Sequence, residues 1–298
     1  MRSILPKMLK MAFPRDLPIS GLHIALVLLT CLVMAPVQAY QAFFDDDPAT
    51  LHAPPEPQLS DLDLDVLLLC GQWGAPVKAA DFEAMMLKDE HRAALQRIHQ
   101  ALGGRVLSST EDMAEFVHQL RRVWFEQKGF QHVFCGEPGV GQDLGGLHYA
   151  PRYWQAQDQG WAGYRKLDRD PNRRPLEKCR RFYVREQIRP PIYSISIAFD
   201  NPEEPENNVK CLGGYHLQMD AERVLIAATQ AFKQANRRVG KNATESCLVE
   251  TRLPGVEPYF STLVIRQRAL RTFYPLADRK PYCHKNKRDY RDCLCSRL

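Results

Sequence analysis

Helical periodicity dominates the chain up to residue 128 and strand-like alternation follows it, and this order limits the folds that the chain can adopt. Residues 80–102 and 109–128 place apolar side chains three and four positions apart, as one buried helix face requires. Ser108 and Glu111 have the spacing of a capping box at the start of the second segment. Both segments are therefore predicted to be helices.

The later part of the chain combines strands with one further helix. Residues 192–199 alternate isoleucine with serine, which is typical of a strand. Residues 220–237 have a helical apolar face behind a capping Asp220, and residues 260–265 and 269–274 are predicted to be two strands joined by a short basic turn. The expected fold class is α+β, with leading helices and then mostly antiparallel β-sheets with packed helices.

Residues 1–39 have the order of a secretory signal peptide. A basic start precedes an apolar run of thirteen residues, 22–34, and residues 37–39 supply the small residues of a cleavage site. Thirteen residues of helix rise about 20 Å, which is less than the roughly 30 Å of a bilayer core. We expect cleavage before Tyr40 and a secreted or periplasmic protein without membrane contact afterwards. An uncleaved membrane anchor is the alternative.

The net charge of +5 is unevenly distributed along the chain. Residues 40–70 contain seven acidic side chains and no lysine or arginine, and residues 40–62 are rich in proline and alanine. We expect residues 40–105 to form an acidic linker followed by an N-terminal helical segment. The excess of basic side chains lies beyond residue 70, which suits a phosphate-bearing partner.

The cysteines agree with export. Eight of the nine lie beyond the predicted signal peptide: Cys70, Cys135, Cys179, Cys211, Cys247, Cys283, Cys293 and Cys295. In an oxidising compartment an even number indicates disulfide bonds, whose pairing the sequence leaves open. A zinc site near Cys283 and Cys293 is the alternative, but its Cys-x-Cys spacing is not the usual one for zinc ligands.

Two histidines sixteen residues apart carry the strongest chemical signal. His132 is predicted to lie on a short strand and His148 on a glycine-rich loop. A loop of this length can fold back and bring both imidazoles into one cleft. Imidazoles exchange protons near neutral pH, so such a pair can serve as acid and base on a phosphate. One packed and one solvated histidine is the alternative that spacing alone leaves open.

Four segments, in this order, resemble the EndoU endoribonuclease family. They are GFQHVFCGE at residues 129–137, GGLH at 145–148, Lys210 on a strand before a helix, and the Thr-x-Tyr-Pro pattern at 272–275. The resemblance implies an EndoU-like catalytic domain over residues 106–298, with a basic, cysteine-containing tail from Arg279 to the end. Residues 40–105 are not covered by it.

The resemblance also implies roles for five side chains. His148 is the expected general base, His132 the general acid and Lys210 the cation that stabilises a charged phosphorane. Tyr274 is expected to stack on a base or ribose, and Thr272 to touch a base edge. The implied enzyme cuts single-stranded RNA at uridylates by attack of the 2′-hydroxyl, leaving 2′,3′-cyclic phosphate and 5′-hydroxyl ends.

RNA supplies its own nucleophile, so we expect no required cofactor and assign no residue to a metal; stimulation by Mn²⁺ is the alternative. RNA is the expected partner, and an immunity or inhibitor protein is a further candidate. The chain departs from the family at Tyr149, where asparagine is common, and at Gly213 and Gly214, where many members have serine or threonine. In some relatives those positions help to recognise uracil. A secreted EndoU-like protein that binds RNA without cutting it is the alternative function.

Overall fold

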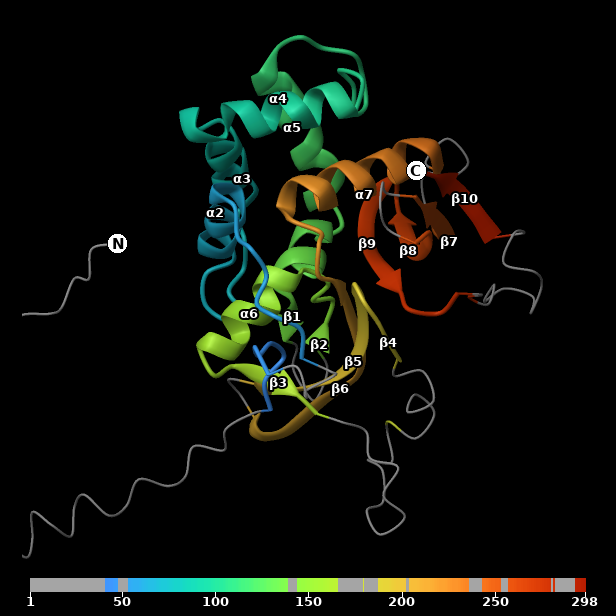
Figure 1. The fold of residues 1–298 in the computed structure, drawn as a ribbon. Coiled ribbons are helices and arrows are strands. Elements are labelled where there is room, and N and C mark those ends of the chain that lie inside the picture. Colours follow the sequence, from blue (N-terminus) through green and yellow to red (C-terminus); the bar gives the residue numbers. More distant parts are fainter. Residues whose placement is uncertain are drawn as a thin grey trace, which may run out of the picture. The chain divides into compact units, whose positions relative to one another are not determined.

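The computed structural model describes residues 41–47, 53–138, 144–165, 179, 187–201, 204–235, 243–252, 257–279, 281 and 293–298. The predicted signal peptide lies outside these residues. Within them, no helix has the length and apolar character that a membrane crossing needs. The described elements combine helices with two four-stranded sheets and a two-stranded one (Figure 1), which confirms the α+β fold class.

The first half of the unit from residue 40 onward is helical. Its elements are α2 (Asp61–Cys70), α3 (Ala79–Met86), the 3-10 turn η1 (Asp89–His91), α4 (Arg92–Ala101), α5 (Met113–Phe125), the π-helical turn η2 (Gln131–Cys135) and α6 (Ala150–Asp158). The helix predicted over residues 80–102 is thus split by an extended Lys88. The capping box expected at Ser108 is wrong, because Asp112 caps α5 and accepts a hydrogen bond from the amide of Ala114.

Helix α2 begins at the end of the predicted acidic linker, residues 40–62, and lies mostly in the helical segment expected after it. Its alternating aspartate and leucine residues have no clear helical pattern, but Ser60 and Asp63 form a capping box at its start. Leu62, Val66 and Cys70 follow at four-residue spacing and are buried. Helix formation is therefore decided by the cap and by tertiary burial, which periodicity alone does not detect.

The strands form two main sheets. They are β1 (Glu137–Pro138), β2 (Leu144–Gly145), β3 (Ala162–Tyr164), β4 (Gln187–Arg189), β5 (Ile192–Asn201), β6 (Glu204–His216), β7 (Thr244–Thr251), β8 (Tyr259–Arg266), β9 (Ala269–Leu276) and β10 (Leu294–Arg297). One sheet has the order β3-β5-β4 with β6 also paired to β5, and the other has the order β10-β7-β8-β9. All pairs are antiparallel except β10 with β7. The strands predicted at residues 192–199, 260–265 and 269–274 are confirmed.

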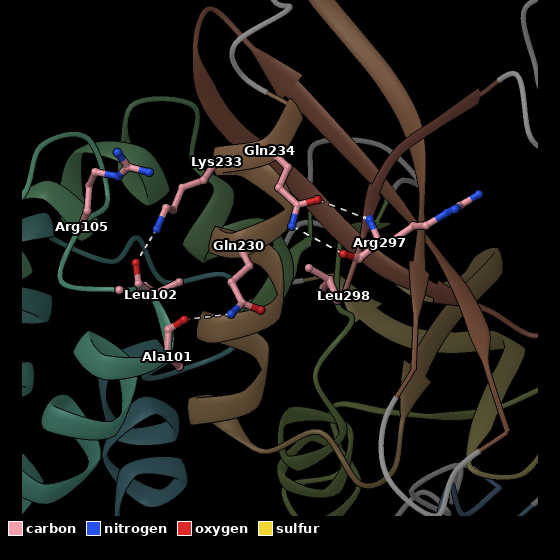
Figure 2. Close-up of a pocket in the computed structure, with 9 residues that line it drawn as sticks. Ala101, Leu102, Arg105, Gln230, Lys233, Gln234, Arg297 and Leu298 are labelled. Atoms are coloured by element: carbon pink, nitrogen blue, oxygen red, sulfur yellow. Dashed lines mark hydrogen bonds between the residues drawn. The ribbon is translucent and has the colours of Figure 1, made fainter.

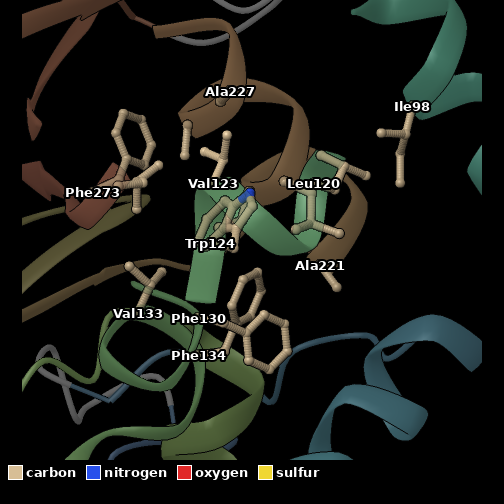
Figure 3. Packing of buried hydrophobic residues seen from close by; sticks show 14 of the residues in the cluster. Ile98, Leu120, Val123, Trp124, Phe130, Val133, Phe134, Ala221, Ala227 and Phe273 are labelled. Atoms are coloured by element: carbon tan, nitrogen blue, oxygen red, sulfur yellow. The ribbon is translucent and has the colours of Figure 1, made fainter. Parts of the chain in front are cut away.

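Helix α7 (Ala221–Ala235) lies across the second sheet in Figure 1. It confirms the helix predicted over residues 220–237. Asp220 caps it by accepting a hydrogen bond from the amide of Arg223 at 2.8 Å. Figure 3 shows how α5, α7, η2 and β9 share one core around Trp124. Phe130 and Phe134 stack at 4.7 Å within this core, so the turn that carries His132 is anchored on both sides of that residue.

Part of the segment expected to be a linker, residues 40–62, packs into a second hydrophobic core. Phe43 and Phe44 are buried against α6 and the first sheet, and both of their amides donate to the side-chain oxygen of Gln157, at 2.6 and 2.9 Å. Burying two adjacent phenylalanines removes a large apolar area from water. The acidic composition therefore concealed a segment that packs on the domain.

Three disulfide bonds are described in full. They join Cys70 to Cys135, Cys179 to Cys211, and Cys247 to Cys295. Cys293 is disulfide-bonded as well. The disulfide prediction is confirmed for these seven residues, and the zinc alternative loses two of its ligands. Cys283 and most of the basic tail lie outside the described residues.

Candidate active site

His132 lies on the π-helical turn η2, and the prediction of a strand at this point is wrong. The turn ends at Gly136, whose φ of +78° favours glycine. At its start, a Cβ atom on Gly129 would lie 2.3 Å from the carbonyl oxygen of Leu270. Gly129 thus lets the turn approach β9 closely, and π-helical turns are common at functional sites.

The loop carrying His148 runs directly beside this turn. The amide of Leu147 donates to the carbonyl of His132 at 2.8 Å, and the amide of His148 donates to that of Val133 at 2.9 Å. Gly146 makes this approach possible, because an added Cβ would lie 1.8 Å from the carbonyl oxygen of His132. The two imidazole rings are consequently 5.7 Å apart, which confirms that the chain brings both histidines together.

A carboxylate faces the first imidazole. Oε2 of Glu137 lies 2.7 Å from Nδ1 of His132, and Arg271 clamps the same carboxylate with bonds of 2.6 and 3.1 Å. Burial lowers the pKa of His132, and the hydrogen bond from Glu137 opposes that effect. Burial would raise the pKa of Glu137, but its bonds to His132 and Arg271 outweigh this and lower it to about 2. The carboxylate therefore stays charged and favours a proton on His132.

The second imidazole faces a neutral partner. Nδ1 of His148 lies 3.1 Å from the carbonyl oxygen of Gly214 and donates to it, so Nε2 is left as the acceptor. The ring also stacks on Tyr274 with centroids 4.8 Å apart. Burial holds the pKa of His148 well below its usual value, and the positive charge of Lys210 lowers it further. His148 is therefore neutral near pH 7.

Lys210 lies on β6, within the same group of side chains. Its ammonium donates to the carbonyl oxygen of Gly146, in the loop that leads to His148. Burial lowers the pKa of Lys210 to about 8, so the side chain is still mostly charged at pH 7. The next residue, Cys211, is disulfide-bonded to Cys179.

Tyr274 and Thr272 lie two residues apart on β9, so strand alternation places both on one face. Tyr274 contacts the site directly through its stack on His148. Thr272 is buried, and its hydroxyl has no hydrogen-bond partner among the described residues. The structure thus joins four of the five predicted residues by contacts and places Thr272 beside them on the strand.

Two residues of this group were not assigned by the sequence. Glu137 is part of the GFQHVFCGE segment, but its pairing with the Nδ1 atom of His132 needs the π-helical turn to form. Nothing in the sequence indicated a role for Arg271, because an arginine on a predicted strand is usually a solvated charge. Its clamp on Glu137 depends on the approach of β9 to the turn.

A pocket also lies between the C-terminal end of α4, helix α7 and strand β10 (Figure 2), and none of the predicted site residues lines it. Its polar side chains hold these elements together. Gln230 donates to the carbonyl of Ala101 at 2.9 Å, and Lys233 donates to that of Leu102. Gln234 hydrogen-bonds the backbone of Arg297. The polar side chains of this pocket are therefore used in contacts between α4, α7 and β10. The two histidines and their neighbours remain the candidate site.

One group of described side chains has the spacing of metal ligands: Asp65, Glu90 and His91. The ammonium of Lys88 lies 2.5 Å from Asp65 and 3.3 Å from Glu90, so a cation already neutralises this group. The ring of His91 also hydrogen-bonds Asp65 at 2.7 Å. These residues fit an ion-pair cluster and do not fit a Mn²⁺ site.

Two adjacent imidazoles are groups that can serve as an acid and a base on one substrate. The model of the bacterial EndoU nuclease family matches residues 126–277, which contain the two histidines, Lys210 and β9. The chain belongs to this family of nucleases.

The chain is also similar to individual proteins. Uridylate-specific endoribonuclease C of Danio rerio is 31% identical over 84 residues, which cover 24% of this chain and 27% of that protein. This chain thus spans about a quarter of the length of that relative. The structure of XendoU, described as a splicing independent snoRNA processing endoribonuclease, has 17% identity and a TM-score of 0.42, over 72% of this chain and 76% of that one. Endoribonuclease Nsp15 of Middle East Respiratory Syndrome Coronavirus has 14% identity and a TM-score of 0.35, over 59% and 40%.

Proposed function

We propose that the protein is an endoribonuclease that cuts single-stranded RNA by attack of a ribose 2′-hydroxyl on the adjacent phosphate. One observation carries this proposal: two imidazoles lie 5.7 Å apart with different partners on their Nδ1 atoms. The carboxylate of Glu137 favours a proton on His132 and opposes the effect of burial, whereas the ring of His148 meets only a neutral carbonyl and stays unprotonated. An acid and a base at this separation suit a reaction in which one proton leaves and another arrives at a single phosphate.

His148 is the proposed general base. Its Nε2 atom accepts the proton of the 2′-hydroxyl while the 2′-oxygen forms a bond to phosphorus. The hydrogen bond from Nδ1 to the carbonyl of Gly214 supports this role, because it selects the tautomer with a free Nε2. The product of this attack keeps the phosphate as a 2′,3′-cyclic ester.

His132 is the proposed general acid. Its Nε2 atom gives a proton to the 5′-oxygen as the bond from that oxygen to phosphorus breaks, leaving a 5′-hydroxyl end. Glu137 supports this role by stabilising the protonated ring. Lys210 would stabilise the extra negative charge on the phosphorane, and its half-buried position strengthens that interaction.

Uridylates are the proposed cleavage sites. The face of Tyr274 offers a stacking surface for a base. The hydroxyl of Thr272 is buried in the RNA-free structure and would reach a base edge only if the side chain became exposed. The name of the Danio rerio relative supports the same preference. Gly213 and Gly214 have no side chain to add to base recognition, so we expect a moderate preference for uridine.

We further propose that the protein acts outside the cytoplasm, with RNA as its partner and no required cofactor; an immunity or inhibitor protein is a further candidate partner. The disulfide bonds support export, because such bonds persist in oxidising compartments. N-terminal sequencing of the exported protein is expected to start near Tyr40. An intact Met1 would refute cleavage.

The mechanism is tested with four substrates of one sequence: RNA, DNA, RNA with a 2′-O-methyl group 5′ to the cut, and RNA in which only that ribose is unmodified. The first and last are expected to be cut, with a 2′,3′-cyclic phosphate detected by mass. The other two lack the attacking hydroxyl and are expected to stay intact. Cleavage of DNA, or products with 5′-phosphate ends, would indicate a nuclease that uses water.

The same assay separates the alternatives. An RNA-binding protein without activity would bind all four oligonucleotides and cut none. Activity is expected to persist in EDTA; stimulation by added Mn²⁺ would then reflect RNA binding or folding. Complete loss in EDTA that Mn²⁺ restores would contradict a cofactor-free reaction.

A further inference from the structure

Tyr149, directly after His148, is turned into the core. The side chain is fully buried, and its ring packs edge-on against Phe134 at 4.9 Å. Its hydroxyl donates a hydrogen bond to Asp63 on helix α2. Burial raises the pKa of Tyr149 well above its usual value, so this hydroxyl keeps its proton and remains a donor.

Asp63 is a buried carboxylate with a complete set of donors. Its Oδ2 atom accepts from the amide and hydroxyl of Ser60 at 2.8 and 2.7 Å. Its Oδ1 atom accepts from the hydroxyl of Tyr149 and, at 2.7 Å, from the amide of Ala221. A buried network in which every member is paired is rigid, because breaking any bond leaves a polar group unsatisfied. Asp63 thus joins the starts of α2 and α7 to the residue that follows His148.

The far end of α2 reaches the other histidine. Cys70, its last residue, is disulfide-bonded to Cys135 at the end of η2. The loop after α2 also holds Gln131, next to His132: its side chain accepts from the amide of Val77 at 2.8 Å and donates to the carbonyl of Ala75 at 2.9 Å. One helix and its following loop are therefore attached to both histidine-bearing segments.

We propose that Asp63 and Tyr149 are positioning residues for His148: their hydrogen bond fixes the backbone of the histidine so that its ring meets Gly214 on one side and Tyr274 on the other. This proposal rests on the proposed RNA cleavage. It also makes helix α2, outside the EndoU-like segment, a working part of the site. A shift of about 1 Å in a catalytic group can cost up to about 100-fold in rate.

The test compares three variants with the full-length protein. Tyr149→Phe removes the hydroxyl and keeps the ring. Asp63→Asn keeps an acceptor for Tyr149, but a weaker neutral one. Thr229→Val is the matched control, because it removes one hydrogen bond from the same core, the 3.0 Å bond from Trp124, without touching either histidine.

We expect Tyr149→Phe to lower kcat by about tenfold or more with KM within about twofold, since substrate contacts remain. Asp63→Asn is also expected to lower kcat and to lose more thermal stability, because its NH2 group cannot accept the bonds that one carboxylate oxygen receives from Ser60. The double variant is expected to lose less kcat than the two single losses combined, because both substitutions weaken the bond between Tyr149 and Asp63. Thr229→Val is expected to keep kcat within about twofold of the wild type. Its loss of thermal stability is expected to be similar to that of Tyr149→Phe. Losses of kcat that simply add in the double variant would overturn the proposal.

A second readout does not depend on cleavage. In NMR spectra of the RNA-free protein, Tyr149→Phe is expected to shift the imidazole signals of His148 more than those of His132, and Thr229→Val to shift neither. If Tyr149→Phe does not fold, Asp63→Asn must show the same selective shift. Unchanged His148 signals in the folded variants would overturn the positioning role. If the wild-type protein cuts no RNA while Tyr149→Phe shows the selective shift of the His148 signals, only the proposed function is refuted and the positioning role stands.

Discussion

The Nδ1 atom of His132 lies 2.7 Å from Oε2 of Glu137, and this contact makes the two histidines of the site unequal. A charged carboxylate favours an imidazolium, whereas the carbonyl that meets His148 orients a neutral ring. Arg271 keeps the carboxylate ionised by binding both of its oxygens. The rings proposed as acid and base therefore differ in their partners, although both rings are partly buried.

The pH dependence of kcat/KM follows from these pKa shifts. The base must be neutral, so the rate rises as pH increases through the lowered pKa of His148. The acid must be protonated, so the rate falls as pH increases through the pKa of His132, which lies below 6.5. We expect a bell-shaped profile with its maximum on the acidic side of pH 6.5. A profile that is flat across this range would contradict the pair.

Glu137→Gln moves one limb of that profile. The carboxylate raises the pKa of His132, so its removal lowers this pKa and shifts the alkaline limb to lower pH. The acidic limb, set by His148, is expected to move less. The measurement is kcat/KM from pH 4 to 8 for both proteins. A shift of the acidic limb alone would reverse the proposed roles of the two histidines.

Substitution of His132, His148 or Lys210 by alanine is expected to lower the cleavage rate by at least about 100-fold, which is what one acid–base group or charge stabiliser commonly supplies. The matched control is His118→Ala, because His118 pairs with Glu83 at the surface, with about half of its side chain exposed. The control is expected to keep the wild-type rate. Circular dichroism must show folded variants. Full activity of a folded His148→Ala protein would refute the assignment.

Gly146→Ala tests the close approach of the two histidine segments. Its Cβ would lie 1.8 Å from the carbonyl of His132, so the loop must move away. Gly103→Ala is the control: its φ of +62° is similar to the +66° of Gly146, but no atom lies within 4 Å of the added Cβ. We expect a loss of about 1 kcal/mol for Gly103→Ala from backbone strain, and a clearly larger loss, with inactivity, for Gly146→Ala. Urea denaturation measures both. Equal losses would show that the approach is not tight.

The bond between Cys70 and Cys135 closes a loop of 65 residues, and replacing both cysteines by serine is expected to cost about 2–5 kcal/mol. The control pair is Cys247 and Cys295, which closes a loop of similar length, 48 residues, between β7 and β10. We expect both double variants to lose stability and the first to lose more activity, because Cys135 lies on the His132 turn. The measurements are urea denaturation and RNA cleavage; greater loss of activity in the control pair would contradict this.

Tyr274→Ala is expected to weaken binding of an uncleavable 2′-O-methyl oligonucleotide by about five- to 150-fold, the range that one stacked base commonly contributes. Tyr274→Phe retains the ring and is expected to bind within about twofold of the wild type. Fluorescence anisotropy at a fixed salt concentration measures both. Equal weakening by both substitutions would indicate that the hydroxyl, and not the ring face, contacts RNA.

The fold class, helix α7 and the strands β5, β8 and β9 could be predicted from the amino-acid sequence, as could the grouping of His132, His148 and Lys210. These features depend on local periodicity or on residues that stand in a recognisable order along the chain. The use of cysteines in disulfides was also visible, because it depends on their number and on signs of export. None of these inferences needs a contact between distant residues.

The tertiary structure produces the π-helical turn at His132 and the packing of Phe43 and Phe44, and it adds burial to the local cap that starts the helix at residues 61–70. It also decided which partner each imidazole meets, and that Tyr149 reaches Asp63, 86 residues away along the chain. Hydrogen bonds between such distant residues leave no periodic trace, because their cost and benefit arise only when the segments are buried together. The residue types of the candidate site can therefore be recognised in the sequence, but the different partners of its two histidines come from the fold.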